Sequence, residues 1–377
     1  MGFRADAGAI DGFGKLVGRA AEGGAEAVSY VGKYATIDET LGGHAWDLVA
    51  GDHDRYVSEA KKALEKIKSV LDSSAGELAR SAVYYRETDQ EAAASFDAGA
   101  QGSKAPSLGS GGDPQDFSDA DDAAGALKKP GGDSGNPLVE YGSGHVDEYK
   151  MSPVQKTLGT ALDFGSPSAM AVEASKLLFG FDPFGIVTNW VFGDWNGYND
   201  CSDAWGSLAS CCDAVAANVR KGNRNVALSW DGNAADTATV YFDEFAKKLD
   251  EIKATFESLQ SCYSQAAQLA FQFAEFLKSF LVMFCDLLVI WMVNMAAAAA
   301  VNAIPVGGQA ASVAMFALAA AQAIRIMGMW AEASKAFDTF ATALSAIALT
   351  LSTAVNGFSA ADGFPEVGSS AYDNQAV

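Results

Sequence analysis

The sequence predicts an all-α protein built from long antiparallel helical hairpins that pack as a four-helix-type bundle. Over long stretches, apolar residues recur at alternating spacings of three and four, which is the period of an amphipathic helix. The longest of these patterns continues without Pro or Gly until Pro305. No segment alternates apolar and polar residues for long enough to predict a strand.

Residues 1–98 predict a first helical hairpin. Its second helix is marked by apolar residues that recur every seven positions: Val57, Leu64, Leu71 and Leu78. Asp52 and Asp54 precede this pattern, where the N-terminus of a helix favours negative charge. The earlier helix, near residues 10–35, is rich in Gly and Ala. We therefore expect two paired helices in this first module.

Residues 99–152 have a different composition, in which Gly, Ser, Asp and Pro dominate. Few of these side chains could bury a hydrophobic core. The composition predicts a flexible linker, either disordered or a long mobile loop.

Residues 153–304 predict a second helical module. Proline residues first divide it into short apolar pieces, and a helix then runs from about Asn199 to Val219, where residues 221–223 (Lys-Gly-Asn) interrupt it. The segment from Ser229 to Ala235 is typical of a tight bend. The longest apolar pattern follows this bend and predicts one helix from Asn233 to Ala303, roughly 100 Å long.

Residues 305–360 predict an apolar return helix, and residues 361–377 a polar tail. The turn before the return helix contains Pro305 and Gly307. No charged residue occurs in 287–304, in 306–324 or in 339–361, so each segment approaches the length that spans a bilayer. Two interpretations stay open, a buried hairpin within a bundle or oligomer and a hairpin that enters a membrane. Either predicts a homo-oligomer or a lipid-bound protein.

The charge of the chain narrows the classes of partner. It has 47 acidic and 26 basic residues, a formal net charge of -21. This balance argues against nucleic acid, because a phosphate backbone requires a basic surface. The N-terminus lacks a basic start followed by an apolar core, so we expect no N-terminal signal peptide.

The five cysteines include no Cys-x-x-Cys pair, and with three histidines they predict neither a zinc site nor a cofactor site. One interpretation treats them as small apolar residues of helices. Another is a disulfide between Cys201 and Cys262, which flank the bend on antiparallel helices at similar distances.

Two short motifs carry the functional hypothesis. Tyr85 and Asp89 are four residues apart at the end of the first hairpin, which predicts that they share a helical face. They are either a solvated helix end or an aromatic ring and a carboxylate that together fill a basic pocket. At the bend, Trp230 would pack the turn and Gly232 would permit it.

Tyr-x-x-x-Asp after a helical hairpin, combined with Trp-x-Gly at a helical bend, resembles the secreted substrates of actinobacterial type VII (ESX) secretion systems. The first module resembles the EspC-like family, the second resembles the WXG family, and their order is similar to that of EspB-type proteins. The resemblance covers roughly residues 1–100 and 190–270. The first module has Trp46 without a glycine two positions later, so it is not a WXG module itself.

This resemblance implies that Tyr85 and Asp89 form an export motif, and that Trp230 and Gly232 lie beside it in one composite recognition end. It implies a type VII secretion ATPase as a partner, a chaperone as a second one, and a protein that is secreted or at the cell surface. The sequence has no Gly-x-Ser-x-Gly and no P-loop, which favours a non-enzymatic role. The leading hypothesis is a structural, oligomerising or virulence-type factor. The alternatives are a pore-forming effector and a carrier or partner of a secreted toxin.

Overall fold

The computed structural model describes residues 3–37, 43–99, 104–106, 108, 112–131, 167–191, 195–305 and 307–365. The protein is all-α, as predicted, and the described residues add two strands of two residues each. The helices are α1 (Ala7–Tyr34), α2 (His44–Ala50), α3 (His53–Glu87), α4 (Gln90–Gly99), α6 (Pro167–Phe179), α7 (Pro183–Val191), α8 (Trp195–Val226), α9 (Asn233–Asn302), α10 (Gly308–Ala354) and the 3-10 helix η3 (Val355–Gly363).

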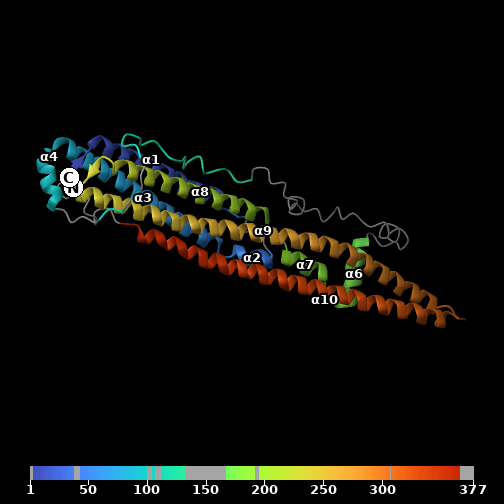
Figure 1. Ribbon diagram of the computed structural model, residues 1–377. Coiled ribbons are helices and arrows are strands. Elements are labelled where there is room, and N and C mark those ends of the chain that lie inside the picture. Colours follow the sequence, from blue (N-terminus) through green and yellow to red (C-terminus); the bar gives the residue numbers. More distant parts are fainter. Residues whose placement is uncertain are drawn as a thin grey trace.

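The helices form one elongated bundle (Figure 1). α1 packs against α3 and α8, and α9 packs against α8 and α10. α4 lies at one extremity, which we call the proximal end, and the turn between α9 and α10 lies at the other, the distal end. α6 and α7 lie beside the part of α9 and α10 that extends beyond the first module.

In the first module, α1 and α3 pack against each other. The seven-residue pattern faces its core, where Leu64, Leu71 and Leu78 are buried. The Gly-rich composition of α1 has a packing role, because a Cβ atom on Gly14 would lie 3.1 Å from the Cβ of Leu78. Small residues on α1 therefore let the two helices approach closely.

The predicted interruption of α8 at residues 221–223 is wrong, because the helix continues to Val226. Gly222 lies where α8 crosses α1, and a Cβ atom there would overlap the ring of Phe13. The Nδ2 of Asn223 donates to the carbonyl of Thr239 at 2.9 Å. Close helix packing, rather than a break in the chain, accounts for these residues.

The long helix was predicted within one residue, because α9 ends at Asn302 rather than Ala303. The return segment predicted at 305–360 contains α10, which covers Gly308–Ala354, and most of η3. The predicted start of the polar tail at residue 361 is wrong. Ala361 and Phe364 are buried, and the Phe364 ring lies 4.7 Å from that of Phe245 on α9. Residues 366–377 of the predicted tail lie outside the described residues.

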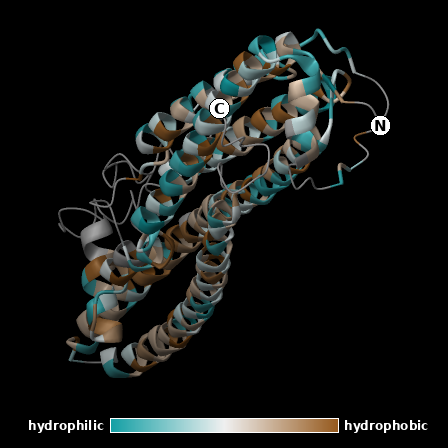
Figure 2. Ribbon diagram, turned by 90° about the vertical axis from the view of Figure 1, so that its left-hand side faces the viewer, coloured by the Kyte–Doolittle hydropathy of each residue, from teal (hydrophilic) through white to brown (hydrophobic). Residues whose placement is uncertain are grey.

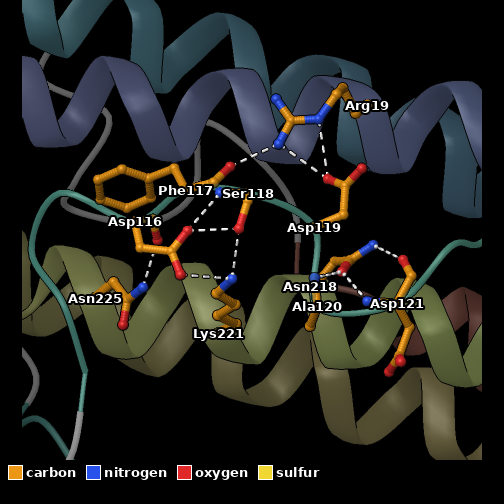
Figure 3. Close-up of polar contacts among 10 residues, drawn as sticks. All are labelled: Arg19, Asp116, Phe117, Ser118, Asp119, Ala120, Asp121, Asn218, Lys221 and Asn225. Atoms are coloured by element: carbon orange, nitrogen blue, oxygen red, sulfur yellow. Dashed lines mark hydrogen bonds and ion pairs between the residues drawn. The ribbon is translucent and has the colours of Figure 1, made fainter.

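The flexible linker predicted at 99–152 needs correction over residues 112–131, which we call the strap. The strap runs along α1 and α8, and Figure 3 shows its polar contacts. Its Asp119 accepts a hydrogen bond from Arg19 of α1 at 2.9 Å, and its Asp116 pairs with Lys221 of α8 at 2.9 Å. The side chain of Asn218 accepts from two strap amides and donates to the carbonyl of Asp121.

The strap also contributes apolar contacts. A Cβ atom on Gly12 would lie 2.5 Å from the Phe117 ring, and Ala123 is buried against Gly23. The same aspartates that suggested a mobile segment instead find basic and amide partners on two helices. The rest of the predicted linker, apart from 104–106, 108 and residue 99, lies outside the described residues, as does the beginning of the predicted second module at 153–166.

The structure contains no Cys201–Cys262 disulfide. Both residues are buried thiols, and the Sγ of Cys201 points to the carbonyl of Thr36 at 3.4 Å. Burial raises the pKa of the Cys262 thiol. The interpretation of these cysteines as small apolar residues therefore fits the structure better.

Candidate recognition site at the proximal end

The proximal end joins the N-terminus to the predicted bend. Strand β1 (Arg4–Ala5) pairs antiparallel with strand β2 (Trp230–Asp231), and Ala5 lies opposite Trp230. The amide of Asp6 donates to the carbonyl of Ser229 at 3.1 Å. This short pairing was not predicted, since two-residue strands carry no period that a sequence could reveal. It ties the first module to the bend of the second.

Trp230 and Gly232 form the bend as the sequence predicts. The Trp230 side chain is 3% exposed, so it belongs to the core. Gly232 has φ 140°, a conformation that residues with a Cβ atom rarely adopt. A Cβ atom there would also lie 2.5 Å from the carboxylate of Asp97. Gly232 is therefore needed for two reasons: it permits the backbone conformation of the turn, and it leaves room for the carboxylate of Asp97 on α4.

Asp97 caps the N-terminus of α9 from another part of the chain. Its carboxylate accepts hydrogen bonds from the backbone amides of Asn233 and Ala234, both at 2.9 Å. The Nδ2 of Asn233 donates to the carbonyl of Asp97 at 2.9 Å. A carboxylate at this position also interacts favourably with the helix dipole. Sequence reasoning assigned no role to Asp97; the only signal was Gly232, which has no side chain to cap the helix.

Tyr85 packs on the bend. Its ring centroid lies 6.0 Å from that of Trp230 and 5.9 Å from that of Phe3. Burial, with a smaller effect from the negative charge of Asp97, raises the pKa of Tyr85 to about 12. The phenol is therefore neutral at physiological pH and is half-buried rather than fully presented to solvent.

Asp89 does not lie on the helix that carries Tyr85. The prediction that the two share a helical face is wrong, because α3 ends at Glu87 and Thr88 is extended with ψ 139°. Asp89 precedes α4 and accepts a hydrogen bond from the amide of Glu91 at 2.9 Å. Its carboxylate is exposed. The structure thus brings Tyr85 to Trp230 and leaves Asp89 as a charged group on the surface.

This geometry suits binding. It combines partly exposed aromatic rings with the exposed carboxylate of Asp89, which a basic pocket could bind. Within the ranges that the structure describes, no three His, Cys, Asp or Glu side chains come together in an arrangement that could hold a metal ion.

The chain was compared with protein-family models, with curated proteins and with solved structures, and none of the three comparisons found a match.

Proposed function

We propose that the protein is a non-enzymatic substrate of a type VII secretion system and acts outside the cell. One observation carries this proposal: the Tyr85 ring packs against the Trp230 ring, so the two motifs form a single end. An export machinery that reads no signal peptide needs a feature of the folded protein. The strand pair and the Asp97 cap hold this end rigidly, which lowers the entropy lost on binding.

In this proposal the two residues of the Tyr-x-x-x-Asp motif have different roles. Tyr85 organises the end by packing on Trp230, whereas the exposed Asp89 supplies the charge that a secretion ATPase recognises. Recognition of an exposed carboxylate by a basic pocket depends on charge-assisted hydrogen bonds.

The test measures export, in a host with a type VII system, of variants that lose a negative charge but keep the shape of the side chain. Asp89→Asn keeps an oxygen that can accept from the Glu91 amide and removes only the charge. We expect its level in the culture supernatant to fall at least about tenfold, the loss of one charged hydrogen bond. Glu91→Gln, a nearby exposed carboxylate, is the matched control and should be exported normally. Equal export of wild type and Asp89→Asn would refute the proposal.

A second observation favours a membrane as the place where the exported protein acts. The helix Asn233–Asn302 and the stretch Gly308–Gly363 are each long and apolar enough to cross a membrane. Several large apolar side chains near the distal end are exposed. A membrane-active role is therefore the favoured form of the proposed function.

A further inference from the structure

The distal end carries a continuous segment without charge, residues 287–324, which we call the distal tip. It contains the end of α9, the turn and the first part of α10, and it has no Asp, Glu, Lys or Arg. Asp286 and Arg325 bound it on the two helices. Hydrophilic residues concentrate on the helices in the upper part of Figure 2, and hydrophobic residues on those in its lower part.

Exposed apolar side chains lie on both flanks of α10 within the distal tip. Val313 is 67% exposed, Leu318 53% and Ile324 68%. At 100° per residue, Val313 and Leu318 point about 140° apart, whereas Ile324 points within about 20° of Val313. The buried stripe of α10, which includes Ser312 and Ala319, lies between these two flanks. A second copy packed on one flank would leave the other in water, whereas lipid would cover both.

The amides of the distal tip satisfy one another inside the hairpin. The Nδ2 of Asn294 donates to the Oε1 of Gln322 at 2.9 Å, and the Oγ of Ser312 lies 3.1 Å from the Oδ1 of Asn302 and 2.9 Å from the carbonyl of Gln309. The Asn294–Gln322 and Asn302–Ser312 pairs join α9 to α10. Water would satisfy such groups on an exposed hairpin, but a hydrocarbon environment would not. The remaining amide side chain, Gln309, lies beside the turn.

The dimensions of the distal tip match a bilayer. Residues 308–324 of α10 extend about 25 Å at 1.5 Å per residue, and the hydrocarbon core of a bilayer is about 30 Å thick. A hairpin of this depth places the turn, with Pro305 and Gly307, near the far headgroups, where its backbone can meet water. Asp286 and Arg325 would stay at the near surface.

We propose that the distal tip inserts into a lipid bilayer as a re-entrant hairpin and that electrically neutral headgroups suffice. The tip has no basic residue to attract anionic lipid, and the net charge of -21 would oppose such attraction. This inference deepens the proposed function, on which it rests for the place where the protein meets a membrane.

The experiment is flotation of the purified full-length chain with phosphatidylcholine vesicles. We compare wild type with the double variant Val313→Asp/Ile324→Asp, which puts charge on one flank of the tip. The matched control is Leu349→Asp, a side chain of α10 that is 71% exposed but lies outside the tip. Wild type and control should float with the vesicles. The fraction of the double variant that floats should be lower by at least about tenfold, since a carboxylate within the hydrocarbon is strongly disfavoured.

Either of two results would overturn the inference: wild type that stays with the unbound protein, or a double variant that floats as well as wild type. A second copy covers the tip instead if wild type does not float and light scattering without lipid shows that wild type is an oligomer whereas the double variant is a monomer. Circular dichroism must show unchanged helicity in both variants, as expected for exposed positions. Because flotation uses purified protein, it can succeed even where the Asp89 export test fails.

Discussion

The two ends of this molecule differ in which side chains they bury and which they leave exposed. At the proximal end, residues far apart in sequence bury Trp230 and satisfy the N-terminus of α9 through Asp97. At the distal end, two helices satisfy their own amides and leave apolar side chains exposed, such as Val313 and Ile324. The difference teaches that the proximal end buries its large aromatic side chain within the chain, whereas the distal end leaves apolar side chains exposed, as the proposed insertion into lipid requires.

The largest expected effect lies in the proximal core. Trp230→Ala should reduce the free energy of unfolding by about 3–5 kcal/mol, because it leaves a cavity where a buried indole packs against Tyr85. Urea denaturation followed by circular dichroism measures this change. Trp230→Phe retains an aromatic ring and should cost less. If Trp230→Ala unfolds at the wild-type urea concentration, the proximal core is not packed as described.

A pair of glycine substitutions compares the bundle with the distal half of α10 directly. Gly222→Ala places a methyl group against Phe13 and should destabilise the protein by about 1–3 kcal/mol. Nothing lies within 4 Å of a Cβ atom on Gly328, so Gly328→Ala should stabilise α10 by about 0.5–1 kcal/mol. Thermal melts of the two variants should therefore shift in opposite directions. Shifts of the same sign would show that one of the two sites is packed differently.

Acid should weaken the bundle through His53. The imidazole is buried, its Nε2–H donates to the Ala35 carbonyl at 3.1 Å, and its Nδ1 accepts from the Tyr263 hydroxyl at 2.5 Å. Burial lowers the pKa of His53, an effect that the Ala35 carbonyl and Asp54 partly oppose. The unfolded chain therefore takes up the proton first, so stability should be constant above about pH 6.5 and fall below it.

The measurement is the melting temperature between pH 7.5 and pH 5 for wild type and His53→Gln, whose amide can both donate and accept at this site. The variant should lose the part of the acid sensitivity that His53 causes. An identical pH profile for wild type and His53→Gln would exclude His53 as a source.

The smallest effect on global stability concerns the strap. Lys221→Gln removes a partly exposed ion pair with Asp116 and should cost less than about 1 kcal/mol. It should nevertheless speed limited proteolysis within residues 112–131, because a locally detached strap is cleaved without unfolding of the bundle. Lys62→Gln, which breaks an exposed pair with Glu59 elsewhere, is the control. Equal cleavage rates in both variants would show that Lys221 does not hold the strap.

Local signals allowed the helices to be predicted, and contacts between distant residues explain the errors. α9 and α10 were predicted closely because the apolar period and the turn at Pro305 are local features. Gly222 was wrongly predicted to interrupt the helix. A glycine is required there because the ring of Phe13, about two hundred residues earlier, leaves no room for a side chain. The order of the strap depends likewise on Arg19 and Lys221, which composition cannot reveal.

In the candidate site, too, features set by local sequence were predicted, and features set by contacts between distant residues were not. The sequence placed Trp230 and Gly232 at a bend because Trp and Gly have local consequences there. It could not reveal the cap by Asp97 or the pairing of Ala5 with Trp230, since both depend on how the modules meet. The prediction that Tyr85 and Asp89 share a helical face was wrong because of a single residue, Thr88, where the backbone leaves the helix.

The central claim is that the proximal end governs export and the distal tip does not. The most direct measurement is the amount of Asp89→Asn and of Val313→Asp/Ile324→Asp in the culture supernatant of one host with a type VII system. The account predicts that Asp89→Asn stays in the cells while the distal variant is exported like wild type. Normal export of Asp89→Asn, or retention of a correctly folded distal variant, would contradict it.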